Sequence, residues 1–171
     1  MEYRIINKSD LPFLIKYFDG LSETTRSYYA PHPFDEPTLQ AICSGNYPDC
    51  QAFIAIQKET IVGYAVIKHG YSDGEWYRFP NYDIHIDPDH QYLIAPSIAD
   101  AYQSKGIGTG MLSLIEDHLK KLGGTHLILW GGVQTRNQQA IRFYQKNGFI
   151  QLGEFYHEGL DNWDMVKDLR S

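Results

Sequence analysis

The sequence has 171 residues, of which 43% are hydrophobic, and a formal net charge of −6 at pH 7. This length and apolar content suit one hydrophobic core, so we expect a single domain over residues 1–171. Because the balance is acidic and no cluster of lysine and arginine occurs, the sequence argues against nucleic acid and anionic membranes as partners.

The two cysteines, Cys43 and Cys50, are too few for a disulfide framework and form no Cys-x-x-Cys pair. Free thiols of this kind indicate a reducing compartment. The first ten residues lack the apolar region of a signal peptide, and apolar runs such as 127–130 are too short to span a membrane. We therefore expect a soluble, cytoplasmic protein.

The first half of the chain alternates capping residues with apolar periodicity. The pattern predicts, in chain order, a strand over Tyr3–Ile6, a helix from Leu11 to Phe18 capped within Asn7–Asp10, a second helix capped at Ser22 that leads to Tyr29, a short helix over Pro37–Cys43, and a hairpin of strands Ala52–Gln57 and Thr60–Lys68.

The middle segment is aromatic and less regular. Gly70–Pro80 is expected to be an extended loop, whereas Asn81–Asp87 is expected to be a strand because apolar and polar residues alternate along it. One face of that strand would carry Tyr82, Ile84 and Ile86, and the other Asp83, His85 and Asp87.

The second half predicts strands that alternate with helices. In chain order these are a strand over Tyr92–Ala99, a helix from Gly108 that ends at Gly123–Gly124, a strand over Thr125–Trp130, a helix over Asn137–Lys146, and strands over Phe149–Tyr156 and Asn162–Val166. We expect this order to build a mixed α/β sandwich with helices on both faces of the sheet.

A glycine-rich turn joins the Tyr92–Ala99 strand to the helix that follows it. Residues 103–110 read Gln-Ser-Lys-Gly-Ile-Gly-Thr-Gly. Glycines allow a sharp bend that exposes successive N–H groups, and with the positive end of the helix dipole these donors suit a pyrophosphate. The same turn can also serve tight packing alone, and its spacing does not decide between the two.

Two known phosphate-binding loops fit this turn poorly. A P-loop places its lysine after the last glycine and before Ser or Thr, whereas Lys105 precedes Gly106. A Rossmann fingerprint opens its βαβ unit, whereas this turn lies well past the middle of the chain.

The turn resembles the signature of the GCN5-related N-acetyltransferases (GNAT), Gln/Arg-x-x-Gly-x-Gly/Ala, which is matched by Gln103, Gly106 and Gly108. Residues 137–149 are similar to a second landmark of that family, Asn-x-x-Ala-x-x-x-Tyr-x-x-x-Gly-Phe. The two motifs stand at the separation that the family shows, and the remainder of the chain fits its template. The departures are a longer segment over 71–90 and Asp100, where the family often has proline.

The resemblance implies the acyl-coenzyme A N-acyltransferase fold, with a central, twisted, mostly antiparallel sheet. It also implies acetyl-coenzyme A as cosubstrate, no metal, and direct transfer of the acetyl group to a primary amine in a ternary complex. Leu21–Arg26 looks like part of the substrate-side helices. A small molecule, a peptide N-terminus and a protein lysine remain open as acceptors, and homodimers are frequent in the family.

The resemblance also implies where the cofactor binds. Backbone N–H groups of the turn would hold the pyrophosphate, the strand before it would pair with the pantetheine arm, and the N–H of Ile98 would polarise the thioester carbonyl. The implied cofactor-binding residues are Ser97, Ile98, Ala99, Gln103, Ser104, Lys105, Gly106, Ile107, Gly108, Thr109, Gly110, Asn137 and Tyr144.

Asn137 and Tyr144 are seven residues apart, so they would share one face of a helix. In the motif that they match, Asn137 would bond to the pantetheine, and Tyr144 would be the catalytic acid that protonates the departing thiolate. Spacing alone favours a packing residue at Tyr144 and a helix cap at Asn137, and Asn137 can serve as both cap and ligand. The match to the motif reverses the preference for Tyr144.

The sequence does not assign the general base. Asp83, His85, Asp87 and Glu23 are candidates, beside a chain of water molecules. The Asp-x-His-x-Asp alternation also suits metal ligands, but without a second His or Cys cluster a solvated polar face is the simpler interpretation.

Two alternative functions remain open. One is a non-catalytic sensor or interaction module that binds an acyl-coenzyme A, and the other is an enzyme of the same fold that transfers a different acyl group. The presence of both Asn137 and Tyr144 argues against the sensor, because a sensor needs no acid beside the sulfur.

Overall fold

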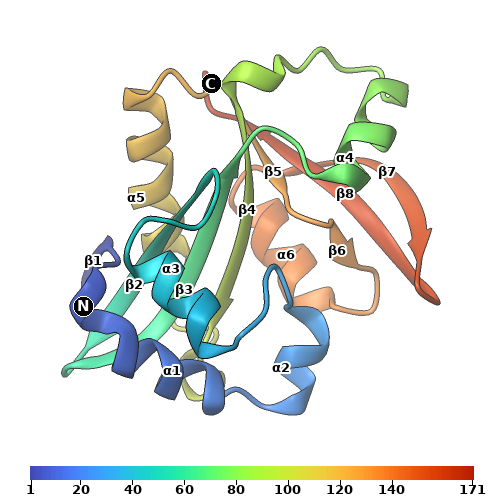
Figure 1. The fold of residues 1–171 in the computed structure, drawn as a ribbon. Helices are drawn as coiled ribbons and strands as arrows, with labels where there is room; N and C mark the ends of the chain where they lie inside the picture. The colour runs from blue at the N-terminus through green and yellow to red at the C-terminus, as the bar shows by residue number, and fades with distance from the viewer. The chain divides into compact units, whose positions relative to one another are not determined.

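A computed structural model describes residues 1–171 and shows a chain made of two units. The first unit comprises Met1–Lys68 and Ala95–His118, and the second comprises His69–Ile94 and Leu119–Ser171. Strand β4 and helix α5 each pass from one unit into the other, as the colours of Figure 1 allow the reader to follow. The expectation of a single domain stays a prediction.

The strands form one sheet in the order β1-β2-β3-β4-β5-β8-β6, with β7 also paired to β8. Strands β4 and β5 are parallel, whereas β1–β2, β2–β3 and the pairs made by β8 are antiparallel. The strands are β1 (Glu2–Ile5), β2 (Cys50–Gln57), β3 (Thr60–His69), β4 (Gln91–Ile98), β5 (His126–Leu129), β6 (Val133–Gln134), β7 (Ile150–His157) and β8 (Leu160–Asp168).

The helices are α1 (Leu11–Asp19), α2 (Glu23–Tyr28), α3 (Glu36–Cys43), α4 (Asp73–Arg78), α5 (Ile107–Lys121) and α6 (Gln138–Lys146). Short 3-10 helices occur at η1 (Lys8–Asp10), η2 (Phe79–Asn81), η3 (Pro88–His90) and η4 (Asp100–Tyr102). The mixed α/β class and the mostly antiparallel sheet are confirmed. None of the helices combines the length and the apolar character that a bilayer crossing requires.

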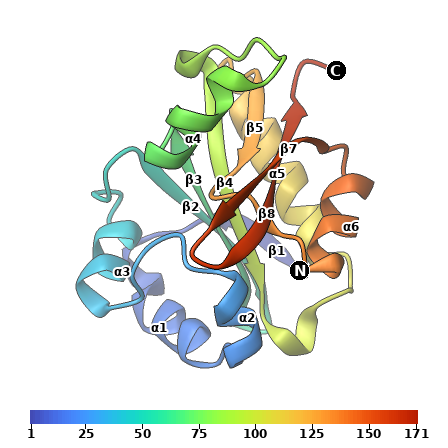
Figure 2. The ribbon, with the colours of Figure 1, turned by 90° about the vertical axis from the view of Figure 1, so that its right-hand side faces the viewer.

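The core of the first unit is built on the hairpin of β2 and β3. Lys58 and Glu59 both have left-handed φ values, 47° and 61°, which suit a tight two-residue turn between antiparallel strands. Helices α1 and α3 lie side by side in this unit (Figures 1 and 2). From α1, Phe18 packs edge-on against Tyr64 of β3 with ring centroids 5.0 Å apart, and both rings are buried.

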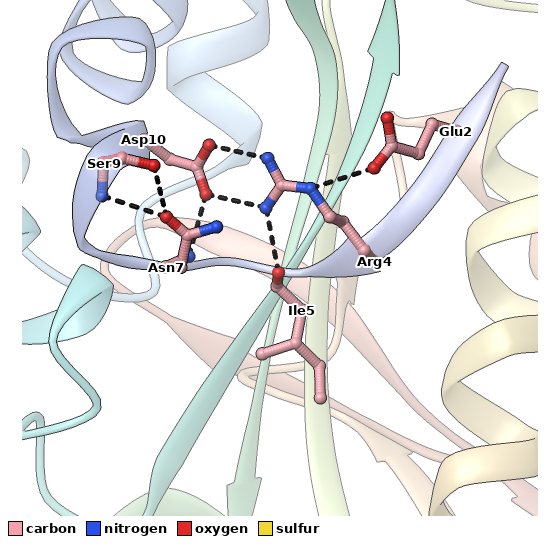
Figure 3. Close-up of polar contacts among 6 residues, drawn as sticks. All are labelled: Glu2, Arg4, Ile5, Asn7, Ser9 and Asp10. Carbon is pink, nitrogen blue, oxygen red and sulfur yellow. Dashed lines mark hydrogen bonds and ion pairs between the residues drawn. The ribbon is translucent and has the colours of Figure 1, made fainter.

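Capping residues join β1 to α1, as the sequence predicts. The carboxylate of Asp10 accepts a hydrogen bond from the Asn7 N–H at 2.8 Å, and Asn7 Oδ1 accepts one from the Ser9 N–H. Arg4 donates to both oxygens of Asp10 at 2.8 Å (Figure 3). Because the guanidinium stabilises the ionised form, the pKa of Asp10 lies below its ordinary value. These bonds fix the end of β1 against the start of α1.

The core of the second unit contains residues from several strands and from the segment before β4. Phe79, Leu93, Ile128 and Val166 form a cluster in which each side chain is at most 3% exposed. The partly buried side chains that pack against it are Tyr71, Tyr82, Ile84, Ile86, Trp130 and Leu152.

The segment between β3 and β4 differs from the prediction in two ways. Asp73–Arg78 forms helix α4 where the sequence predicts an extended loop, and Asn81–Asp87 forms no strand. The backbone N–H of Tyr82 bonds to the carbonyl of Phe79, within the turn of η2. The alternating apolar residues do face the core. The pattern therefore predicted the buried side correctly, although the segment makes no strand hydrogen bonds.

Buried charges hold this segment to β8. Asp164 is fully buried and accepts two hydrogen bonds from Arg78, at 2.6 and 2.9 Å, and a third from the Tyr82 hydroxyl at 2.7 Å. The Arg78 guanidinium also lies 3.6 Å from the centre of the Phe155 ring. Both carboxylate oxygens of Asp164 accept hydrogen bonds from the segment between β3 and β4. These bonds offset the cost of burying the charge.

The substitution Asp164→Ala should lower the free energy of unfolding by about 3–5 kcal/mol, because it removes the carboxylate that bonds to Arg78 and leaves only Glu75, 3.6 Å away, beside the guanidinium. Urea unfolding followed by circular dichroism measures this change. Asp87→Ala is the matched control, since Asp87 pairs with His90 at the surface, and little change is expected there. A loss below about 1 kcal/mol in Asp164→Ala would show that the buried pair does not hold the segment.

Candidate functional site

The glycine-rich turn adopts the backbone conformations that its composition predicts. After β4 the chain passes through η4 and reaches Ser104 and Gly106, whose φ values of 60° and 80° are left-handed. A Cβ atom placed on Gly106 would meet nothing within 4 Å, so the space beside this residue is open. Left-handed residues in such a turn direct successive N–H groups to one side, where they can bind an anion.

Helix α5 begins inside this turn, at Ile107. The bond from the Gly110 N–H to the Gly106 carbonyl, at 3.2 Å, closes its first turn. The N–H groups of Ile107, Gly108 and Thr109 therefore precede the helical bonding pattern and add to the positive end of the helix dipole. Free N–H groups at the start of a helix are a kind of site at which proteins bind phosphate groups.

Side-chain contacts of Tyr3 and of two residues of the turn itself support the turn. The ring of Tyr3 lies over Gly110 so closely that a Cβ atom there would come within 2.5 Å of the ring carbon Cζ. Lys105 donates to the carbonyl of Ala101 at 2.8 Å, and its ammonium adds positive charge beside the turn. Gln103 donates from Nε2 to the carbonyl of Ile98 at 3.2 Å, which ties the turn to the end of β4.

Strand β4 presents alternate residues to its two edges. The carbonyl of Gln91 accepts from Gly70 and the N–H of Ala99 donates to Val62, so the odd-numbered residues face the β3 side. The even-numbered residues face the opposite edge, where the carbonyl of Ile94 accepts from the N–H of Trp130 at 2.9 Å. The implied residues Ser97 and Ala99 thus lie on the β3 side, and Ile98 lies on the opposite edge.

Pro96 interrupts the edge that carries Ile98. Pairing of β4 with β5 is described from Gln91 to Ile94, and the next residue on the same edge is Pro96, which has no N–H group. The N–H of Ile98 is the next donor along that edge. The geometry therefore leaves one backbone donor beyond the proline where a thioester carbonyl can be polarised.

Buried tyrosines fix the same part of β4 from within the first unit. The hydroxyls of Tyr17 and Ser97 lie 2.8 Å apart, and Tyr29 donates to the carbonyl of Ala95 at 2.9 Å. Tyr17, Tyr29 and Ser97 are each less than 9% exposed. Burial raises the pKa of Tyr17 above its ordinary range, so the phenol is neutral and keeps this hydrogen bond.

In the second unit, Asn137 caps helix α6. Its Oδ1 accepts from the Ala140 N–H at 3.2 Å, and its carbonyl accepts from the Ile141 N–H at 3.1 Å. The cap occupies the side-chain oxygen, whereas the amide N–H groups of Asn137 can still donate to a ligand. The sequence left a cap and a ligand-binding residue open, and this geometry permits both.

Tyr144 lies near the end of the same helix and is 9% exposed. Its ring packs edge-on against Phe143 and Phe149, with centroids 5.3 Å away in both pairs. Burial alone raises the pKa of Tyr144, so the phenol keeps its proton well above neutral pH. The residue therefore packs in the core with a neutral phenol, and its role as an acid stays a prediction.

The side chains considered as general bases come from two separate segments of the chain. Asp83, His85 and Asp87 lie outside any strand, and Asp87 accepts from the Asp89 N–H and bonds to His90 at 2.8 Å. Glu23 occupies the first turn of α2. No group of three or more His, Cys, Asp or Glu side chains is arranged to hold a metal ion. The general base stays unassigned.

The sequence analysis did not single out Glu75, which is 1% exposed. Its carboxylate accepts from the N–H of Gly131 at 2.6 Å and from the hydroxyl of Ser72. The spacing Ser72-x-x-Glu75 is that of a helix capping box, so a search for caps would have predicted α4 and drawn attention to this carboxylate.

Comparison with known proteins gives a family match and several fold matches. The profile of the Acetyltransferase (GNAT) family matches residues 17–149. No curated protein matches the chain in sequence.

Among solved structures, the chain is similar to the GNAT domain of S. lividans PAT, with 15% identity and a TM-score of 0.76 over 97% of this chain and 89% of that one. It is similar to the ribosomal-protein-alanine N-acetyltransferase from Brucella melitensis, with 20% identity and a TM-score of 0.74 over 98% and 99% of the two chains. For AAC(6')-Ib in complex with Parmomycin and AcetylCoA, the identity is 21% and the TM-score 0.72, over 97% and 92%. At these identities the likeness shows the fold.

The contact between Tyr3 and Gly110 predicts that Gly110→Ala changes the stability in opposite directions with and without the Tyr3 ring. Gly110→Ala should destabilise the native chain by about 1–3 kcal/mol, because the new methyl group overlaps the Tyr3 ring. In a Tyr3→Ala background the same change should stabilise by up to about 1 kcal/mol, since alanine favours a helix more than glycine does. Chemical unfolding of the four proteins measures both effects, and equal values in the two backgrounds would contradict the contact.

Proposed function

The chain belongs to the acetyltransferase (GNAT) family, and from this premise we propose that it transfers the acetyl group of acetyl-coenzyme A to a primary amine. The observation that carries the proposal is the turn at 103–110, where a left-handed Gly106 opens space beside the first N–H groups of α5. In the proposal both substrates bind before reaction, and the amine attacks the thioester without a covalent enzyme intermediate.

The first step is the placement of acetyl-coenzyme A. The N–H groups of residues 103–110 would bind its diphosphate, and Lys105 would add a positive charge nearby. The edge of β4 that carries Ile98 would pair with the pantetheine arm. Ser97 and Ala99, whose backbone groups face β3, would hold that edge in position. The N–H of Ile98 would then point at the thioester oxygen and stabilise the negative charge that develops there.

The second step is acetyl transfer. The neutral amine nitrogen forms a bond to the carbonyl carbon and gives up one proton to water or to the unassigned general base. The bond from carbon to sulfur breaks, and the sulfur leaves as a thiolate that takes up a proton. We assign that proton to Tyr144, because it stands at the tyrosine of the family motif and its phenol is protonated at neutral pH. The amide of Asn137 would orient the pantetheine while its oxygen caps α6.

The class of acceptor is the open part of the proposal. Among the similar structures are an aminoglycoside acetyltransferase and a ribosomal-protein-alanine acetyltransferase, so both small-molecule and protein amines occur as acceptors of this fold. The formal charge of −6 favours a cationic acceptor over an acidic one. Calorimetric titration with acetyl-coenzyme A, followed by thiol release over a panel of amines, tests the proposal. Tight binding without release for any amine would favour the non-catalytic sensor.

Gly106→Asp should abolish the binding of coenzyme A, because the new carboxylate fills the open space with negative charge. Gly45→Asp is the matched control: Gly45 has a φ of 72°, also has open space at its Cβ position, and lies in the same unit but outside the turn. Both variants should lose similar stability through backbone strain, and only Gly106→Asp should lose affinity in calorimetry. Unchanged affinity in Gly106→Asp would remove the diphosphate from the turn.

Tyr144→Phe should lower kcat by roughly 10²-fold while the affinity for coenzyme A changes little, because only the proton for the departing sulfur is lost. Steady-state thiol release and calorimetry separate the two quantities. Tyr156→Phe makes the same chemical change at a site that is 71% exposed and should leave both unchanged. An equal loss of affinity and turnover in Tyr144→Phe would indicate that the tyrosine only packs.

A further inference from the structure

The carboxylate of Asp100 binds the start of helix α2. Its Oδ1 accepts from the hydroxyls of Ser22 and Thr25 at 2.6 and 2.7 Å, and its Oδ2 accepts from the Ser22 N–H at 3.0 Å. Ser22 is also the N-cap of α2, since its hydroxyl oxygen accepts from the Thr25 N–H at 3.2 Å. Asp100 therefore fixes the residue that begins the helix.

Helix α2 depends on such polar contacts because it has almost no packing of its own. It is six residues long, and none of its side chains is buried. Helices this short are unstable without external contacts. Besides Asp100, the side chain of Arg26 donates to the carbonyls of Leu21 and Phe18, which ties α2 back to the end of α1.

Asp100 stands between the two parts of the proposed cofactor site in the first unit. It follows β4 by two residues and precedes Gln103, the first residue of the turn. Gln103 itself reaches both sides, since its Nε2 donates to Ile98 at 3.2 Å and lies 3.4 Å from the Thr25 hydroxyl. Any ligand that orders residues 98–103 therefore also orders the groups that hold Ser22 and Thr25.

The carboxylate is ionised when it makes these bonds. Burial opposes the charge, but the hydrogen bonds from Ser22 and Thr25 outweigh it and hold the pKa of Asp100 below its ordinary value. Hydrogen bonds to an ionised acceptor are stronger than those between neutral groups. A proline, which the resembling family often has at this position, offers no such acceptor.

We propose that Asp100 is a positioning residue that couples the acceptor-side helix α2 to the coenzyme A turn, so that coenzyme A orders α2 when it binds. The inference rests on the proposed function for the identity of the ligand. The coupling is reciprocal: an α2 that is held in place also tightens the binding of coenzyme A. The element with two states is α2 itself, which is either formed against Asp100 or frayed.

Hydrogen–deuterium exchange on the millisecond scale, read over residues 21–29 of the full chain, tests the coupling with coenzyme A as the probe. In the native protein, saturating coenzyme A should slow exchange there by about 5-fold or more. In Asp100→Ala, exchange without ligand should be roughly 10-fold faster, as for a lost helix cap, and coenzyme A should no longer slow it. The affinity of the Asp100→Ala variant for coenzyme A should fall by the same factor by which coenzyme A slows exchange in the native protein.

Asp35→Ala is the matched control. Asp35 caps α3 through the N–H and the hydroxyl of Thr38, at 3.0 and 2.9 Å, in the same unit but away from the turn. It should loosen α3 alone and leave both the affinity for coenzyme A and its effect on residues 21–29 as in the native protein. Asp100→Asn keeps one oxygen acceptor without the charge, so it should give an intermediate result and carries the test if the alanine variant does not fold.

The outcomes separate this inference from the proposed function. If calorimetry shows that coenzyme A binds the native chain but exchange over residues 21–29 does not change, the coupling is overturned and the acetyltransferase proposal stands. Retention of the ligand effect in Asp100→Ala would overturn it equally. If the native chain binds no coenzyme A, both proposals fall together.

Discussion

The candidate site depends on the backbone hydrogen bonding of strand β4, which differs between the two edges of the strand. Its odd-numbered residues bond toward β3, and its even-numbered residues face the other edge. On that second edge Pro96 removes one donor, and Ile98 supplies the next one. A strand with a continuous ladder on both edges would have no N–H group left for a thioester. The proline thus interrupts the ladder on the edge that the proposal assigns to coenzyme A.

The position of this edge is set by polar groups inside an apolar core. Tyr17 and Tyr29 bury their rings in the first unit and place their hydroxyls on Ser97 and on the carbonyl of Ala95. Phenylalanine would fill the same volume but could not fix the strand along its length. Gln103 makes a third bond, to the carbonyl of Ile98, on the edge that the ligand would use. The end of β4 is therefore held by directional bonds, which fix the position of its backbone as the proposed role in catalysis requires.

Local signals in the sequence were sufficient for most of the fold. The caps at Asn7 and Ser22, the two-residue turn between β2 and β3, and the apolar stripe of α5 each act over a few residues, so the sequence could predict them. The segment Asn81–Asp87 was predicted wrongly, because alternation shows which side chains are buried but not whether a neighbouring strand can accept the backbone.

The candidate site could be predicted only in part for a related reason. The glycine turn is a local feature, and its left-handed Gly106 follows from its composition. The ties from Asp100 to Ser22 and Thr25 join residues that lie more than seventy positions apart, so no spacing rule could indicate them. Tyr144 shows a different limit. Spacing predicts a packing residue and the motif predicts an acid; the buried ring agrees with the first, and the second stays a prediction.

The segment 71–90 supplies hydrogen-bond and ion-pair partners for polar groups that the strands of the second unit leave unpaired. Strand β5 ends at Leu129, and the N–H of Gly131 just beyond it has the carboxylate of Glu75 as its acceptor. Asp164 in β8 needs a cation, which Arg78 provides from the same helix α4. A shorter connection would leave a backbone donor and a buried carboxylate without partners, and either is costly in a core. The bonds that Glu75 and Arg78 make therefore give this segment a structural role, whether or not it also contacts the amine that receives the acetyl group.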